Sequence, residues 1–320
     1  MARQVGGGSS YEQGRLTARP GSASTTAEPP SPGLHALALG QGRDGALLVP
    51  PEMGAGTTLP LVLALHGAGG VTAQMLDLMA PVAQSRNVAL LVPESRASTW
   101  DVIGGGYGPD VAFIDRALGA AFERMPIDPG RIAIAGFSDG ASYALSLGVA
   151  NGDLFSDILA FSPGFMAAPD QEGSPRIFIS HGQNDQVLPI DRCSRRLAPA
   201  LERAGYDLEY LEFDGGHVVP TAMIERAFAR FLAEPARPDQ LATAPAAFRT
   251  GVQRATSLST SFCRASGPRS APSGSTPPRS SRRLRVVSSD TALSSASTSF
   301  ARTSEGRPFG PNTAFQAETS

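Results

Sequence analysis

Residues 131–148 read RIAIAGFSDGASYALSLG, and this stretch predicts a buried strand, a sharp turn and a helix in direct succession. Its first five residues are mostly apolar, as expected of a strand that is covered on both faces. The turn follows the pattern Gly-x-Ser-x-Gly over residues 136–140, where glycines let the strand and the helix approach closely. Such a turn lifts the hydroxyl of Ser138 above the end of a sheet, so Ser138 is the first candidate for a chemical role.

Strand-like and helix-like segments alternate on both sides of this stretch, over residues 34–234. Short apolar runs predict strands at residues 46–49, 61–65, 88–92, 131–135, 157–161, 176–180 and 208–213. Apolar residues at helical spacing predict helices at residues 72–86, 110–124, 141–150, 191–204 and 221–233. This alternation predicts an α/β protein with a mainly parallel sheet flanked by helices. In such sheets ligands bind beyond the carboxyl ends of the strands, so the loops after the strands are the candidate sites.

The two ends of the chain differ in composition from this central region. Residues 1–33 are rich in Gly, Ser, Thr and Pro, and we expect them to form a disordered leader. Residues 235–320 form a Ser/Arg/Pro-rich basic stretch, which we expect to be a disordered tail. Only two cysteines are present, Cys193 and Cys263, so the sequence excludes a framework of several disulfides.

Charge is unevenly distributed along the chain, although the net charge is only −2. Residues 41–234 carry 13 arginines and 23 acidic residues, and this acidic balance argues against a nucleic-acid partner for the central domain. Residues 235–320 carry 11 arginines and four acidic residues. This tail, with Ser-Arg-Arg-Leu-Arg at 281–285, is either a solvated extension or a segment that binds anionic polymers, and we favour the first. We therefore expect deletion of residues 240–320 to leave the activity of the domain unchanged.

Several other classes of protein are not favoured by the sequence. The apolar runs are much shorter than the roughly 18 residues that a membrane-spanning helix requires, so no membrane span is expected. The first 30 residues lack the apolar segment of a secretory signal, which predicts a cytoplasmic protein. No cluster of His, Cys and Asp has the spacing of a metal site, and no phosphate-binding or dinucleotide motif is present. We expect neither a metal nor a cofactor.

A serine hydroxyl becomes a nucleophile when a base takes its proton and an acid orients that base. An elbow of this kind is followed along the chain first by the acid and then by a histidine. The histidines after Ser138 are His181 and His217. His181 lies too close to the end of the strand at 176–180 to leave room for a preceding acid. His217 follows the last predicted strand and is the expected base.

The acid is expected in a loop between Ser138 and His217. Asp185 meets this requirement, because it follows the strand predicted at 176–180. Asp191 is a competitor that we expect to cap the next helix. Asp214 is so near His217 in sequence that an orienting geometry is difficult. We therefore select Asp185.

Backbone amides are the expected stabilisers of the negatively charged oxygen that forms in such a reaction. One amide comes from the residue after the nucleophile, which is Asp139. The other comes from the loop after an early strand, here the glycine-rich residues 66–70. We select Ala68 as this second donor, with Gly67 as the near alternative.

Four stretches together resemble the α/β-hydrolase superfamily, in its phospholipase/carboxylesterase branch. They are LPLVLALHGAGG (59–70), residues 131–148, PRIFISHGQNDQVLPI (175–190) and LEFDGGHVVP (211–220). Polyhydroxybutyrate-depolymerase-like and dienelactone-hydrolase-like esterases are close neighbours of this branch. Dienelactone hydrolases have a cysteine nucleophile and depolymerase-like relatives commonly have alanine after the nucleophile, whereas this chain has Ser138 and Asp139. The resemblance implies a serine esterase with Ser138 as nucleophile, Asp185 as acid and His217 as base.

The substrate implied by this resemblance is a small-molecule carboxylic ester, with thioesters and lysophospholipids as variants. Residues 162–175 are too few to form a full helical cap, so the site is expected to be open. Phe165 in this segment and Trp100 in the loop after an earlier strand are candidate substrate contacts, and core packing is an equal alternative for Trp100. The competing hypothesis is an inactive binding or scaffold protein built on a hydrolase fold.

Overall fold

The computed structural model describes residues 10–21, 30–40, 42–52 and 56–234. All of them lie in the first of the two units into which the chain divides, Met1–Ala265. The second unit, Ser266–Ser320, and the whole of the tail predicted at 235–320 lie outside the described residues. The expectations for that tail therefore remain predictions.

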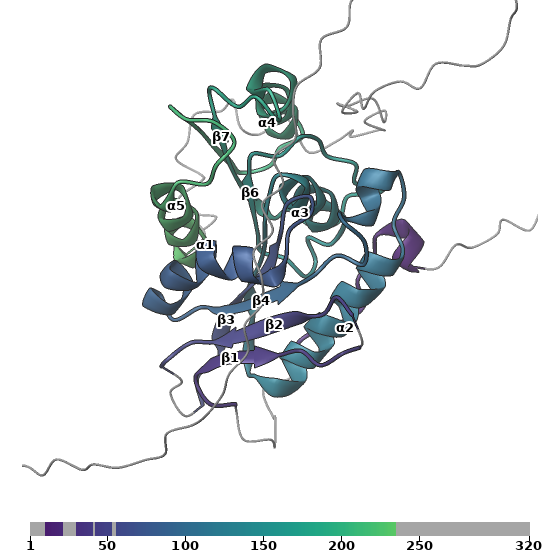
Figure 1. Cartoon of the computed structure of the whole chain (residues 1–320), viewed down its shortest axis with the longest axis vertical. Helices are drawn as coiled ribbons and strands as arrows, with labels where there is room; N and C mark the ends of the chain where they lie inside the picture. The colour runs from purple at the N-terminus through teal and green to yellow at the C-terminus, as the bar shows by residue number, and fades with distance from the viewer. Residues whose placement is uncertain (1–9, 22–29, 41, 53–55, 235–320) are drawn as a thin grey trace, which may run out of the picture. The chain divides into compact units, whose positions relative to one another are not determined.

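An eight-stranded sheet forms the centre of the domain, in the order β1-β2-β4-β3-β5-β6-β7-β8 (Figure 1). Its strands are β1 (Gly33–Ala36), β2 (Gly45–Val49), β3 (Leu59–Leu65), β4 (Ala89–Pro93), β5 (Ile127–Phe137), β6 (Asp157–Phe161), β7 (Arg176–Gly182) and β8 (Leu208–Phe213). β2 is antiparallel to both of its neighbours, and the pairs from β4 to β8 are all parallel. The predicted α/β fold with a mainly parallel sheet is confirmed.

Both faces of the sheet are covered, which explains why its central strands are apolar almost throughout. Leu61, Leu63 and Leu65 of β3 point to one hydrophobic cluster, and Val62 and Ala64 point to the other. Neighbouring side chains on a strand alternate between the two faces of the sheet. A strand between two helical layers is therefore apolar on both faces.

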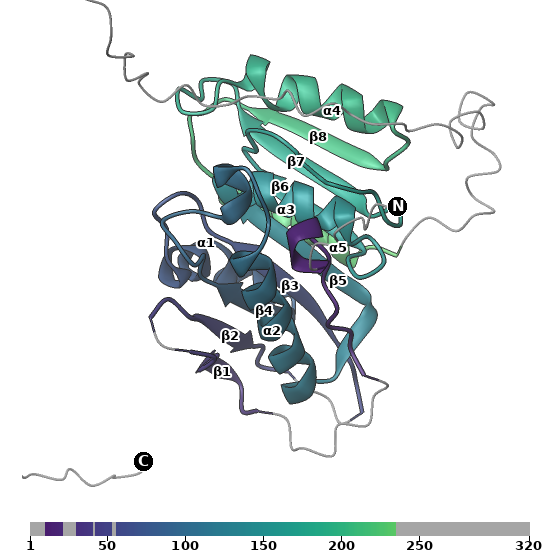
Figure 2. The ribbon, with the colours of Figure 1, turned by 90° about the vertical axis from the view of Figure 1, so that its right-hand side faces the viewer.

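Five helices form these covering layers. They are α1 (Thr72–Ser85), α2 (Pro109–Arg124), α3 (Asp139–Ala150), α4 (Ser194–Arg203) and α5 (Thr221–Leu232). α1 and α5 bury their apolar side chains in one cluster, whereas α2, α3 and α4 bury theirs in the other, on the opposite face (Figure 2). The connection from β6 to β7 contains no helix, as expected for a fold with little or no cap.

Two elements differ from the sequence-based expectations. The short edge strand β1 was not predicted, because its four residues include only two apolar side chains and alternate between half-buried and exposed. The helix expected at 191–204 is instead a short 3-10 turn (Ile190–Arg192) followed by α4, with Cys193 between them in a non-helical conformation. Among the described residues no helix has the length and apolar character needed to cross a bilayer.

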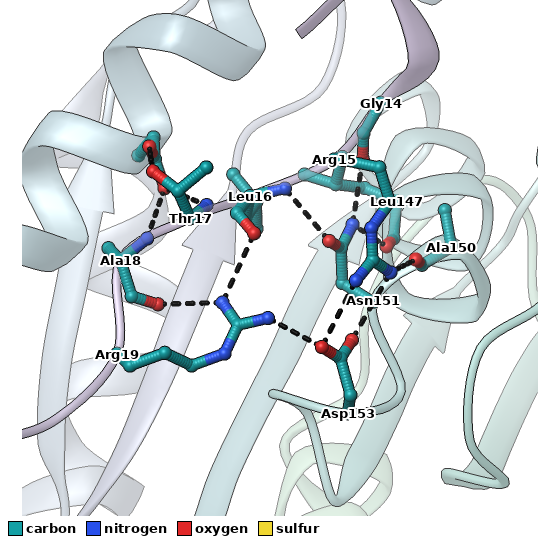
Figure 3. Close-up of polar contacts among 11 residues, drawn as sticks. Gly14, Arg15, Leu16, Thr17, Ala18, Arg19, Leu147, Ala150, Asn151 and Asp153 are labelled. Atoms are coloured by element: carbon teal, nitrogen blue, oxygen red, sulfur yellow. Dashed lines mark hydrogen bonds and ion pairs between the residues drawn. The ribbon is translucent and has the colours of Figure 1, made fainter. Parts of the chain in front are cut away.

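Part of the predicted leader is packed on the domain, which corrects the expectation for residues 10–21 (Figure 3). Leu16 is buried in the hydrophobic cluster beneath α2 and α3, with only 2% of its surface exposed. The carboxylate of Asp115 on α2 accepts the backbone amides of Thr17 and Ala18, each at 2.7 Å. One buried leucine and a set of buried polar partners thus order a segment whose overall composition is typical of disorder. Residues 30–33, the end of the predicted leader, are also described and lead into β1 at Gly33, whereas residues 1–9 and 22–29 lie outside the described residues.

The same segment also reaches the loop that follows α3. The side-chain oxygen of Asn151 accepts the amide of Leu16 at 2.9 Å, and its NH2 group donates to the carbonyl of Gly14 at 2.8 Å. Arg15 and Arg19 both pair with Asp153 at the surface. The segment therefore connects α2 with the end of α3 through contacts with residues about 100 to 140 positions away.

Candidate active site

The elbow between β5 and α3 holds Ser138 in a strained backbone conformation, with φ 57° and ψ −119°. A side chain at Gly136 would collide with the carbonyl of Gly140, and one at Gly140 would collide with the carbonyl of Leu65. Only glycine fits at either position, because the backbones of β3, β5 and α3 meet there. The strain is thus imposed by tight packing around the serine, as at other functional turns.

The loops after β5, β7 and β8 bring three predicted site residues together. Nε2 of His217 lies 2.9 Å from Oγ of Ser138, and Nδ1 of His217 lies 2.6 Å from Oδ2 of Asp185. A carboxylate can only accept a hydrogen bond, so Nδ1 carries the proton and Nε2 is left to accept the serine hydroxyl. The arrangement can therefore remove a proton from Ser138.

Asp185 is buried and its two oxygens have separate partners. Oδ1 accepts the backbone amides of Val187 and Leu188, each at 2.8 Å, which leaves Oδ2 facing His217. The two competing acids are engaged elsewhere. Asp191 pairs with the nearby Arg195, and Asp214 accepts from the side chain of Asn184.

His181, the other histidine that follows the serine, is fully buried beside Asp185 rather than beside Ser138. Its Nε2 lies 2.8 Å from the carbonyl of Leu188, and its Nδ1 lies 2.6 Å from the hydroxyl of Ser194. The carbonyl can only accept, so Nε2 carries the proton and Nδ1 accepts from the serine. Burial lowers the pKa of His181, which favours this neutral form.

The glycine-rich loop at 66–70 lies directly against the elbow. A Cβ built on Gly67 would be 3.3 Å from the Cβ of Ser138. The amides of Gly69 and Gly70 are engaged with the carbonyls of Ser98 and Gly67. The amide of Ala68 has no hydrogen-bond partner among the described residues. This leaves the amide of Ala68 available for a ligand.

The second predicted donor, Asp139, is the first residue of α3. An amide at this position of a helix has no partner within the helix. The Asp139 side chain accepts the hydroxyl of Thr99 at 2.7 Å, a contact that the sequence analysis did not predict. Thr99 and Asp139 lie 40 positions apart, and no local pattern connects them.

The two predicted substrate contacts have different surroundings. Trp100 is only 1% exposed, its indole N–H donates to the carbonyl of His66 at 2.8 Å, and its ring stacks on Tyr143. This favours core packing, the alternative considered for Trp100, over contact with substrate. Phe165 is half-buried in the loop after β6, and the neighbouring amide of Gly164 is held by the hydroxyl of Ser142 at 2.9 Å.

Apolar side chains that the sequence analysis missed lie next to the acid and the histidine. Val187 is 65% exposed and Val218 is 53% exposed, and they follow Asp185 and His217 closely in the chain. The ring of Phe137 packs on His217, with 4.7 Å between ring centroids. Within the described ranges no group of three or more His, Cys, Asp or Glu residues could hold a metal ion.

The sheet order and the strained elbow after β5 are those of the α/β-hydrolase fold. Residues 111–233 are similar to the phospholipase/carboxylesterase family, whose model they match. The solved structure of the apoenzyme of S-formylglutathione hydrolase from Staphylococcus aureus has the same fold. It aligns with a TM-score of 0.52 at 16% identity, over 64% of this chain and 99% of that one.

Two fungal proteins are similar in sequence. The probable feruloyl esterase C of Aspergillus niger is 26% identical over 167 residues, which are 50% of this chain and 60% of that protein. Feruloyl esterase C of Emericella nidulans is 27% identical over 158 residues, which are 47% of this chain and 57% of that protein. The chain therefore spans less than two thirds of the length of these relatives.

Proposed function

We propose that this protein hydrolyses carboxylic esters through an acyl-enzyme formed on Ser138. The observation that carries the proposal is the pair of contacts made by His217, at 2.9 Å to Ser138 and 2.6 Å to Asp185. The similarity to esterases in sequence and to the phospholipase/carboxylesterase family supports the same class of reaction.

In the first half of the reaction, Oγ of Ser138 attacks the ester carbonyl carbon while its proton passes to Nε2 of His217. Asp185 stabilises the resulting imidazolium and keeps its ring in place. The amides of Ala68 and Asp139 donate to the negatively charged oxygen of the tetrahedral intermediate. The carbon–oxygen bond of the alcohol then breaks, and His217 gives its proton to the leaving oxygen.

In the second half, water replaces the alcohol. His217 takes a proton from the water as its oxygen attacks the acyl carbon, and a second tetrahedral intermediate forms at the same two amides. The bond to Ser138 then breaks, and His217 returns its proton to the serine oxygen. The products are a carboxylic acid, an alcohol and the original enzyme.

We further propose that the substrate is a small ester whose apolar group contacts Phe165, Val187 and Val218. Val187 and Val218 are exposed in the loops that carry Asp185 and His217, and Phe165 lies in the loop after the parallel strand β6. Hydroxycinnamoyl esters are the first class to test, because the similar fungal proteins are named feruloyl esterases. A panel that compares feruloyl, acetyl and longer alkyl esters of one alcohol measures this preference through kcat/KM. Equal kcat/KM for acetyl and feruloyl esters would contradict an apolar acyl site.

We also propose that the catalytic unit extends from Ser10 to Glu234, because residues 10–21 pack on the domain. The cytoplasmic location stays a prediction from the sequence.

Labelling with a fluorophosphonate probe tests the mechanism directly, since such probes react with an activated serine. The wild-type protein should be labelled and should hydrolyse p-nitrophenyl acetate, and Ser138→Ala should lose both properties. Ser85→Ala, which changes an exposed serine at the end of α1, is the matched control and should behave as wild type. A folded wild-type protein that is neither labelled nor active would overturn the proposal and favour a binding protein on a hydrolase fold.

A further inference from the structure

His66 is a buried histidine that has no part in the reaction described above. It directly follows β3, it is fully buried, and it is the first residue of the loop that carries Ala68. Its Nδ1 lies 2.7 Å from the carbonyl of Gly67, and its Nε2 lies 3.0 Å from the amide of Ser95. Both ring nitrogens therefore contact backbone groups.

These partners determine where the imidazole carries its proton. The carbonyl of Gly67 can only accept, so Nδ1 must be protonated. The amide of Ser95 can only donate, so Nε2 must be unprotonated, and Arg43 presents a second donor to it at 3.3 Å. His66 is thus held as one neutral tautomer. Burial and the nearby Arg43 lower its pKa, while the hydrogen bond to Gly67 and the charges of Glu94 and Asp139 oppose that shift; the net lowering is consistent with the neutral form.

The proton on Nδ1 fixes the direction of one peptide group. The carbonyl of Gly67 accepts from His66 and also from the amide of Gly70 at 3.0 Å. The peptide between Gly67 and Ala68 is trans, so its N–H points away from its C=O. Two hydrogen bonds on the carbonyl therefore fix the direction of the Ala68 N–H, on a loop that lies against Ser138.

Other residues of the loop at 66–70 are also fixed by hydrogen bonds. Arg43 donates to the carbonyl of Gly70 at 2.7 Å, and the amide of Gly69 donates to the carbonyl of Ser98 at 2.6 Å. Gly69 has φ +67°, in the left-handed region that lets the turn close. These contacts position the loop, whereas the Nδ1 proton of His66 acts on the peptide that carries the Ala68 amide.

We propose that His66 is a positioning residue, which orients the Ala68 amide toward the negatively charged oxygen of the tetrahedral intermediate through its Nδ1 proton. The inference rests on the proposed ester hydrolysis. It differs from a purely structural role, in which His66 only fills space and satisfies the amide of Ser95.

Two substitutions separate these roles, because they preserve different nitrogens of the ring. His66→Asn places an amide NH2 near the position of Nδ1 and keeps a donor for Gly67. His66→Gln places its amide near the position of Nε2 and keeps an acceptor for Ser95, but it loses the donor to Gly67. The measurements are kcat and KM for p-nitrophenyl acetate, together with Tm.

We expect His66→Gln to lower kcat by about 100-fold, the usual effect of losing one oxyanion donor, with little change in KM. His66→Asn should keep kcat within about tenfold of wild type, although the buried Ser95 amide loses its partner and Tm falls further than in His66→Gln. His66→Asn should therefore have the higher kcat of the two variants, and His66→Gln should have the higher Tm.

Equal kcat for the two variants, or a kcat that follows Tm, would overturn the positioning role. The wild-type protein and Ser138→Ala are assayed in the same series. Absence of wild-type turnover would instead overturn the proposed ester hydrolysis, so failure of the two proposals is distinguishable. The acid side of the pH–kcat/KM profile should be the same in wild type and His66→Asn, because the neutral imidazole of His66 adds no ionisation to the wild-type profile.

Discussion

Nε2 of His181 lies 3.3 Å from Oδ2 of Asp185, the same oxygen that faces Nδ1 of His217 at 2.6 Å. His217 directs its N–H at this buried oxygen, and the other oxygen accepts two backbone amides. These donors hold the carboxylate of Asp185 in a single orientation. The N–H of His181 donates to the carbonyl of Leu188 at 2.8 Å, so its ring lies beside the carboxylate. His181, whose side chain does not reach Ser138, is therefore part of the support for the acid.

Two replacements of His181 should distinguish its hydrogen bonds, which support the loop of Asp185, from its packing in the core. His181→Gln keeps an N–H near the position of Nε2, and it should retain most of the activity. His181→Leu leaves the carbonyl of Leu188 and the hydroxyl of Ser194 without this partner, at a cost of about 1–3 kcal/mol for each buried group. Urea unfolding and kcat measure both effects. Equal losses in the two variants would show that the N–H of His181 is unimportant.

Asp185→Asn should lower kcat by about 10⁴-fold with little change in KM, because an amide NH2 facing His217 favours the wrong tautomer of the imidazole. Asp191→Asn is the matched control, since Asp191 is an exposed acid of a nearby loop that pairs with Arg195. It should keep kcat within about twofold of wild type. The prediction fails if Asp185→Asn remains as active as this control.

The stability of the domain should depend on the protonation of Asp110. Burial raises the pKa of Asp110 from 3.8 to about 6, and the nearby Asp101 contributes to the increase. The folded state then binds the proton more tightly than the unfolded state, so the stabilisation contributed by this one group is fully present below about pH 4 and is lost as the pH rises through about 6. The expected loss from this one group is about 3 kcal/mol across that window.

Asp110→Asn removes the ionisation and should flatten this part of the stability profile. The measurement is the free energy of unfolding in urea between pH 4 and pH 7, compared with wild type. Asp77→Asn, which changes an exposed acid on α1, serves as the control and should keep the wild-type slope. Identical slopes in wild type and Asp110→Asn would contradict the raised pKa.

Truncation of Leu16 should show that the segment at residues 10–21 belongs to the folded domain. Leu16→Ala leaves a cavity in the hydrophobic cluster and should lower the free energy of unfolding by about 2–5 kcal/mol. Arg19→Ala, in the same segment, removes a surface ion pair with Asp153 and hydrogen bonds to the carbonyls of Leu16 and Ala18 but leaves no cavity, so it should cost less, about 1 kcal/mol. If Leu16→Ala were as stable as Arg19→Ala, the segment would contribute little to the fold.

Local patterns in the sequence were sufficient to predict most of the strands and helices. The strands at 157–161 and 208–213 were predicted with the bounds that the structure has, because short apolar runs ended by turn residues are a local signal. The elbow around Ser138 was also predicted from local sequence, because its Gly-x-Ser-x-Gly pattern lies between an apolar strand and a helix. Gly136 is required by contact within this unit, whereas Gly140 is required by the neighbouring strand β3. Chain order then limited the choice of the acid and the histidine to a few residues.

Tertiary structure alone decided which of these residues meet and in what chemical state. Ser138 and His217 are 79 positions apart, and only the parallel register of β5 to β8 brings their loops to the same edge of the sheet. The burial of Trp100, the ordering of residues 10–21 and the tautomer of His66 likewise depend on partners from distant segments. The physical reason is that hydrophobic periodicity depends on residues that are neighbours in the sequence. These hydrogen bonds instead depend on two atoms that become neighbours only when distant segments fold together.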